Sequence, residues 1–148
     1  MNDQTTERTL KLSGTCLKLN PANYTVWHYR RQCMQALAGG NNSALSEEVI
    51  QRDLDFSASL GGENPKNYQI WYHRRALLEK IAQTDTFKDY FLDSERKYVA
   101  QVLQEDSKNY HAWSHRQWII QTVNDEEVWK DEIEYGKFFV PDTCTTKK

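Results

Sequence analysis

Several residue types and features are scarce in this 148-residue sequence, and each scarcity excludes a class of protein. There are three cysteines, three prolines and six glycines, and the formal net charge is only −2. Cys16, Cys33 and Cys144 are odd in number and far apart, which argues against a disulfide framework and favours reduced thiols. The near-neutral charge provides no basic field for nucleic acid, so we expect no nucleic-acid partner.

Long hydrophobic runs are also missing. No stretch approaches the roughly 18 apolar residues that a membrane-spanning helix requires, so we expect no membrane span. Residues 1–9 are polar and lack the apolar core of a signal peptide. Hydrophobic residues make up 39% and charged residues 27%, as in a folded globular protein. The sequence therefore predicts a folded cytoplasmic protein.

The main positive signal is a block of the form Asn-Tyr-x-x-Trp-x-x-Arg that occurs three times. Its members are Asn23, Tyr24, Trp27 and Arg30; Asn67, Tyr68, Trp71 and Arg74; and Asn109, Tyr110, Trp113 and Arg116. The three tryptophans follow one another at intervals of 44 and 42 residues. A period of this length suits two helices with their turns, and it exceeds the roughly 34 residues of a tetratricopeptide unit.

Each block is typical of the second helix of a helical hairpin. The asparagine stands where an N-cap belongs, and Pro21 and Pro65 lie just upstream, where they end the preceding helix. We expect second helices near 23–38, 67–83 and 109–121. The first helices are expected at 5–19, 46–59, 88–103 and 126–139.

These elements predict an all-α fold, a right-handed superhelical stack (solenoid) of antiparallel hairpins. We expect a single repeat domain over residues 1–142 with an incomplete fourth repeat, because a fourth first helix is present and Pro141-Asp142 resembles the next turn. The tail at 143–148 does not match the repeat. Cys144 is fifth from the C-terminus, which rules out a prenylation box.

Structural interpretations exist for most of the repeated polar residues. The arginines are expected to bind carbonyls or a carboxylate of an adjacent hairpin, and the tyrosines of the blocks to pack within the stack. His111 and His115 are spaced as half a zinc site, but the glutamate of the metalloprotease motif is missing, and we favour packing or hydrogen bonding. We therefore predict no metal ligands in this chain.

Three stretches carry a family resemblance. They are residues 19–31 (LNPANYTVWHYRR), 65–71 (PKNYQIW) and 108–118 (KNYHAWSHRQW). At these residues the chain resembles the protein prenyltransferase α subunits, in wording closest to the subunit shared by protein farnesyltransferase and type I geranylgeranyltransferase. The likeness extends over about residues 7–139, and the chain looks like part of such a subunit.

The resemblance implies a heterodimer. The α chain of this family forms a crescent of helical hairpins around a β subunit, which supplies the zinc site for the substrate thiol and most of the isoprenoid cavity. It also implies that the isoprenoid diphosphate and a cysteine-box protein meet at the subunit interface. No cofactor is expected on this chain itself, although magnesium is a candidate companion of the diphosphate.

By matching residues, the resemblance assigns a site to the third block. Lys108 would face the diphosphate, with Tyr110 beside it as a second donor, and His111 is a further candidate for substrate contact. An ammonium and a phenol suit this chemistry because negative charge grows on the departing diphosphate in the transition state. Against this stands Lys66, which occupies the same place in the second block, so that Lys108 could equally be a solvated turn residue.

Two rival functions stay open at the level of sequence. One is a non-catalytic helical-repeat scaffold that binds a peptide or protein. The other is the α chain of the Rab-directed geranylgeranyltransferase, which shares the repeat.

Overall fold

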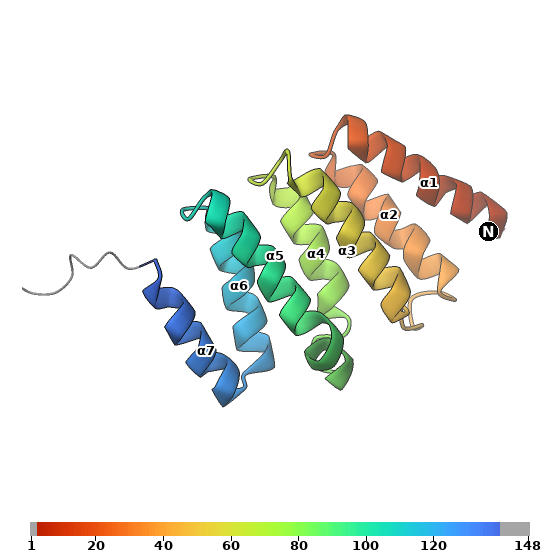
Figure 1. Cartoon of the computed structure of the whole chain (residues 1–148). Coiled ribbons are helices and arrows are strands. Elements are labelled where there is room, and N and C mark those ends of the chain that lie inside the picture. Colours follow the sequence, from red (N-terminus) through yellow and green to blue (C-terminus); the bar gives the residue numbers. More distant parts are fainter. Residues whose placement is uncertain (1–2, 140–148) are drawn as a thin grey trace, which may run out of the picture. The chain divides into compact units, whose positions relative to one another are not determined.

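The computed structural model describes residues 3–139 (Figure 1). These residues form seven α-helices and one π-helical turn, and no strand occurs among them. The helices are α1 (Asp3–Leu19), α2 (Tyr24–Leu37), α3 (Glu47–Gly61), α4 (Tyr68–Glu79), the turn η1 (Phe87–Phe91), α5 (Leu92–Glu105), α6 (Tyr110–Val123) and α7 (Glu126–Lys137). The predicted all-α hairpin fold is confirmed. The handedness of the superhelix, the crescent shape and the single domain over 1–142 stay predictions.

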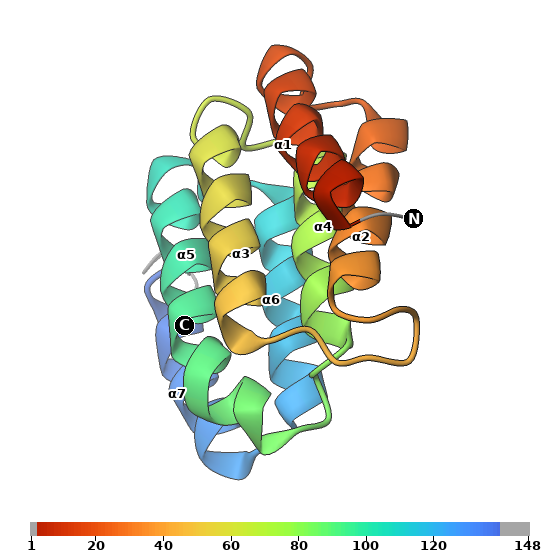
Figure 2. The same ribbon diagram turned by 90° about the vertical axis from the view of Figure 1, so that its right-hand side faces the viewer.

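The chain divides into two compact units, residues 1–81 and 82–148. In the first unit α1 lies antiparallel beside α2, and α3 beside α4 (Figures 1 and 2). Its central cluster consists of Leu17, Trp27 and Ile70, with Val26, Phe56 and Leu60 packed around it. Because these side chains come from all four helices, the core joins the two hairpins into one body.

In the second unit α5 packs against α6, and α7 follows along the other side of α6 (Figure 1). The core is apolar and aromatic. It contains Phe87, Phe91, Leu92, Val99, Leu103, Ile119 and Ile120. Asn124 ends α6 in the left-handed conformation, φ +47°, which turns the chain directly into α7.

Helix starts and turns agree closely with the sequence, with one difference. The predicted helix at 88–103 begins instead as the π-helical turn η1, in which Phe87 and Phe91 are both buried. The Leu92 N–H donates to the Phe87 carbonyl, five residues earlier, so this turn contains one residue more than an α-helical turn. Both phenylalanine rings stay in the core. The turn after α2 contains Gly39 and Gly40, and both glycines have φ near +100° (+104° and +103°), a conformation that glycine adopts without strain.

Residues 140–148 lie outside the described part of the chain, and with them the expected turn at Pro141-Asp142, the tail at 143–148 and Cys144. Within residues 3–139 no helix is both long and apolar enough to cross a membrane.

Candidate functional site

The turn before each second helix is closed by the same two side chains. Asn109 accepts the N–H groups of His111 (3.0 Å) and Ala112 (3.2 Å) at its Oδ1, and so caps α6. The Trp113 indole Nε1–H donates to the Ser107 carbonyl at 2.8 Å, six residues back. Asn23 and Asn67 cap α2 and α4 likewise, and Trp27 and Trp71 bond the carbonyls of Pro21 and Pro65 at 2.8 Å. The Asn-Tyr-x-x-Trp part of the block is thus a turn-closing device.

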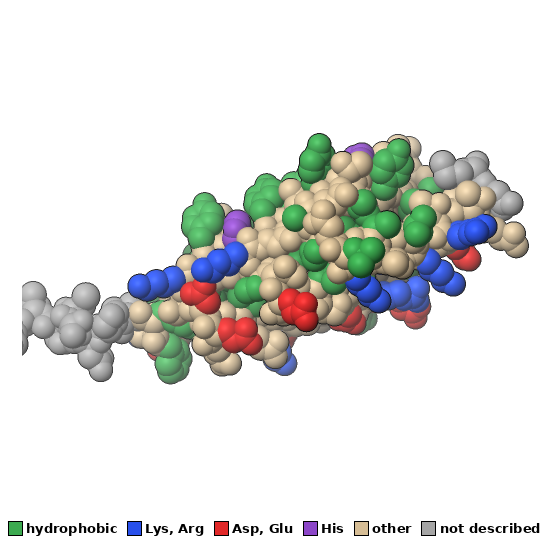
Figure 3. Space-filling model, turned by 90° about the horizontal axis from the view of Figure 1, so that it is seen from above, with side chains coloured by type: hydrophobic (Ala, Val, Ile, Leu, Met, Phe, Trp, Pro, Cys, Tyr) green, Lys and Arg blue, Asp and Glu red, His purple; other side chains and the backbone are tan. Residues whose placement is uncertain are grey.

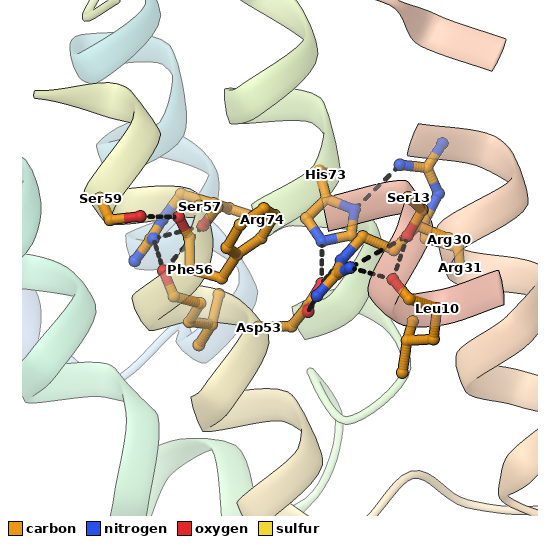
Figure 4. Close-up of polar contacts among 11 residues, drawn as sticks. Leu10, Ser13, Arg30, Arg31, Asp53, Phe56, Ser57, Ser59, His73 and Arg74 are labelled. Atoms are coloured by element: carbon orange, nitrogen blue, oxygen red, sulfur yellow. Dashed lines mark hydrogen bonds and ion pairs between the residues drawn. The ribbon is translucent and has the colours of Figure 1, made fainter. Parts of the chain in front are cut away.

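A buried polar network joins the two hairpins of the first unit (Figure 4). From α2, Arg30 donates to Asp53 on α3 through Nε (3.0 Å) and Nη2 (2.5 Å), and through Nη1 to the Leu10 carbonyl and to Ser13 Oγ on α1, both at 3.0 Å. On the other side of Asp53, the imidazole Nε2 of His73, from α4, lies 2.5 Å from its Oδ2. One carboxylate therefore ties together side chains from three helices.

The charge states in this network follow from burial and hydrogen bonding. Burial by itself would raise the pKa of Asp53, but hydrogen bonds from His73 and Arg30 outweigh it and hold that pKa below its usual value. Burial lowers the pKa of His73, against the opposing effect of the Asp53 carboxylate. Asp53 is therefore ionised and His73 neutral at neutral pH.

The second unit repeats this pattern with different partners. His115 on α6 lies 2.9 Å, Nε2 to Oε2, from the buried Glu95 on α5. Arg116 donates to Glu132 on α7, by Nη2 at 2.8 Å and also by Nε, and its guanidinium carbon lies 3.7 Å from the ring centroid of Tyr135. An arginine of the block again links its own hairpin to the next helix.

The tyrosines of the three blocks are not packing residues, and the interpretation of them as such is wrong. Tyr24, Tyr68 and Tyr110 are 69%, 58% and 75% exposed. Each is the first residue of its helix, three positions before the tryptophan of its block. The rings are therefore accessible to solvent or to a ligand. Figure 3, which colours tyrosine together with the hydrophobic residues, shows hydrophobic side chains projecting from the surface.

Lys108, Tyr110 and His111 lie together at the start of α6. Lys108 is exposed in the turn, where its own N–H donates to Asp106 Oδ1 at 3.0 Å. The rings of Tyr110 and His111 are 5.9 Å apart and nearly perpendicular, at 72°. No carboxylate within residues 3–139 forms an ion pair with the Lys108 ammonium, which is therefore available to an anionic ligand. Lys66 is also exposed, in the matching turn before α4.

A second accessible feature, a groove, lies on the first unit and was not predicted from the sequence. It has a volume of about 470 Å³ and runs between the starts of α2 and α4. Its lining consists of Tyr24, Thr25, His28, Arg31, Tyr68, Gln69 and Tyr72. The sequence contained a signal for this groove, since Tyr24 and Tyr68 occupy the same position of their blocks and Arg31 follows the block arginine Arg30. Periodicity alone, however, cannot distinguish an open face of a helix from a packed one.

The described residues contain no cluster of three or more His, Cys, Asp or Glu side chains that could hold a metal ion. His111 and His115, which are spaced as half a zinc site in the sequence, have different neighbours. His111 lies beside Tyr110, and His115 contacts the Glu95 carboxylate.

With the hairpins defined, comparison with known proteins identifies the repeat. The family model described as "Protein prenyltransferase alpha subunit repeat" matches residues 6–37, 50–81 and 92–123. The chain belongs to this family. Each matched stretch contains one hairpin, namely α1 with α2, α3 with α4, and α5 with α6.

A curated protein also matches part of the chain in sequence. Over 35 residues the chain is 49% identical to the protein farnesyltransferase/geranylgeranyltransferase type-1 subunit alpha of Solanum lycopersicum. That stretch covers 24% of this chain and 10% of the length of the tomato protein. The family assignment made from the sequence is confirmed.

Proposed function

We propose that this chain acts as part of the α subunit of a heterodimeric protein prenyltransferase. With a β subunit it would transfer a farnesyl or geranylgeranyl group from the diphosphate to the thiol of a C-terminal cysteine box. The single observation that carries the proposal at the level of the site is the exposed group at the start of α6, Lys108 with Tyr110 and His111, in a repeat of the prenyltransferase α-subunit family. We place the complex in the cytoplasm.

In the proposed reaction the cysteine thiol first loses its proton to solvent. The resulting thiolate attacks the first carbon of the isoprenoid, a C–S bond forms, and the C–O bond to diphosphate breaks. The electron pair of that bond leaves with the diphosphate. Lys108 and the Tyr110 hydroxyl would donate hydrogen bonds to its oxygens, where charge increases as the bond breaks. Zinc, which activates the thiol, is expected in the β subunit, and magnesium is a candidate companion of the diphosphate.

The test is the substitution Lys108→Ala in the complex of this chain with a farnesyltransferase-type β subunit. Loss of one preorganised donor commonly costs about 3–4 kcal/mol in transition-state stabilisation, so we expect turnover to fall about a hundredfold or more. Assembly of the two subunits, followed by gel filtration, should change little because Lys108 contributes no packing. Turnover is measured as single-turnover prenyl transfer to a cysteine-box peptide.

Lys66→Ala is the matched comparison because Lys66 stands in the same turn position one hairpin earlier. A drop in turnover with Lys66→Ala and none with Lys108→Ala would move the diphosphate role to the second hairpin. No binding to the β subunit by the unmodified chain would instead favour the non-catalytic scaffold.

A further inference from the structure

His73 joins a buried ion pair to a surface groove. Its ring is completely buried and lies against Trp27, with ring centroids 4.4 Å apart. Nε2 faces Asp53, at 2.5 Å from Oδ2, and Nδ1 faces the Nη1 of Arg31 at 3.0 Å (Figure 4). Both ring nitrogens are therefore engaged, one toward the interior and one toward the groove.

The chemistry of the two partners fixes the proton on the ring. A guanidinium has only donors, so Nδ1 facing Arg31 must accept and cannot carry a proton. An ionised carboxylate only accepts, so Nε2 facing Asp53 must carry the proton and donate. His73 is consequently the neutral tautomer with its proton on Nε2. A proton added to Nδ1 would place a donor against a donor.

The charges around the ring act in the same direction. Arg30 and Arg31 on α2 face one carboxylate, Asp53 on α3, while α1 contributes only the neutral Ser13 hydroxyl and the Leu10 carbonyl. On α4, the Tyr72 hydroxyl is the other titratable group beside Arg31. A protonated His73 would be a third cation against one anion. Its pKa is accordingly lowered, first by burial and further by both arginines, against the opposing effect of Asp53.

Arg31 is the cationic wall of the groove at the starts of α2 and α4. Its guanidinium carbon lies 5.2 Å from the ring centroid of Tyr72, and both residues line the groove. Burial lowers the pKa of Arg31, although a guanidinium stays charged throughout the physiological range. The side chain is thus held between an aromatic face and the acceptor nitrogen of His73.

We propose that His73 is a positioning residue for Arg31, which it holds at the groove by accepting at Nδ1 while donating to Asp53 at Nε2. One imidazole then contacts both the Asp53 carboxylate of the ion pair that joins the two hairpins and the Arg31 guanidinium that faces the groove. Acidification that protonates His73 converts Nδ1 into a donor, and Arg31 leaves its place over Tyr72. This inference concerns the groove of the first unit and does not depend on the roles proposed for Lys108 and Tyr110.

The first test uses the full chain without substitution. The ¹⁵N chemical shifts of the two His73 ring nitrogens at pH 7 distinguish the tautomers directly. We expect a protonated Nε2 and an unprotonated Nδ1. A proton on Nδ1, in the neutral or the doubly protonated ring, would overturn the proposal.

The second test removes the donor. Arg31→Met keeps the unbranched stem and eliminates both the charge and the N–H groups of the side chain. The pKa of His73 should therefore rise, as expected when a nearby cation is removed. Arg75→Met is the control, since Arg75 lies exposed on α4 and pairs with Glu79. An unchanged His73 titration in Arg31→Met would contradict the proposal.

A matched pair of substitutions separates the two nitrogens. His73→Asn places an acceptor near the position of Nδ1, whereas His73→Gln places a donor near the position of Nε2. We expect the Arg31 Nη1–H protons, which face His73 Nδ1, to exchange with water at least about tenfold faster in His73→Gln, while His73→Asn stays near the unsubstituted chain. Equal exchange in both variants would mean that His73 only fills space.

Discussion

At the scale of the residue, the repeated block separates into two groups with different tasks. Asparagine and tryptophan close the turn. Arg30 and Arg116 link their hairpins to the next helix, whereas Arg74 donates to the Leu54 carbonyl and Ser57 within its own hairpin. The tyrosines and Lys108 are exposed. Repetition in the sequence shows which positions matter but not for which of these two reasons, because a structural requirement and a binding surface both recur with the period of the fold.

Removal of one indole hydrogen bond should weaken the first unit measurably. Trp27→Phe leaves the Pro21 carbonyl without its donor and opens a small cavity beside Leu17, so we expect a loss of about 2–3 kcal/mol in the free energy of unfolding. Urea denaturation measures it. Tyr29→Phe on the same helix is the control and should change stability by less than about 0.5 kcal/mol, because Tyr29 is exposed. Equal effects of the two changes would contradict the assigned role of Trp27.

Acid should destabilise the first unit in two steps. His73 has a folded-state pKa below the usual 6.5, so the unfolded chain binds a proton first and stability falls as the pH drops below about 6.5. Asp53, with a folded-state pKa below 3.8, contributes stability that is lost as the pH falls through that lower value. Urea denaturation between pH 4 and pH 8 measures the first step.

The variant His73→Asn should flatten the decline just below pH 6.5, since the titrating ring is gone. His28→Asn is the control because His28 is exposed on α2. A decline of the same size in all three proteins would assign the pH dependence to other groups.

At the scale of the element, the sequence predicted helix positions to within a few residues. The asparagine caps explain this accuracy, since each fixes the start of a helix by a local hydrogen bond. The π-helical turn η1 was missed because it has no propensity signal of its own. It exists because Phe87 and Phe91 both reach the core, which is a tertiary requirement.

Loss of a cap should be visible at the start of its helix. Asn109 is buried and its Oδ1 accepts two backbone N–H groups, so Asn109→Ala should lower stability by about 1–2 kcal/mol. Hydrogen exchange should accelerate at the amides of His111 and Ala112 above all. Asn109→Ser, which retains an acceptor, should recover part of the loss, and a loss as large as with alanine would refute the capping role.

At the scale of the whole molecule, the repeat predicted how many hairpins to expect but not how the chain divides into compact units. The division falls at residues 81–82, between the second and third hairpins. It reflects where the buried contacts concentrate, and these depend on side-chain packing that a periodic pattern leaves open. The groove and the His73 network escaped prediction for the same reason, since they join residues from several helices.

Residues 1–81 should fold on their own. The core of Leu17, Trp27 and Ile70 and the network of Arg30, Asp53 and His73 lie entirely within them. We expect a helical circular-dichroism spectrum and a cooperative unfolding transition when unfolding is monitored by tryptophan fluorescence. The shorter segment 1–66 lacks α4, and with it Ile70 and His73, and should show no cooperative transition. Non-cooperative unfolding of 1–81 would contradict the division.

The bond from each block tryptophan to a carbonyl six residues earlier also has a consequence during synthesis of the chain. Such a contact lies within one short stretch, so it needs no distant partner and closes at little cost in chain entropy. A nascent chain leaving the ribosome can therefore set each turn as soon as its tryptophan emerges. Hairpins would then mature in order from the N-terminus.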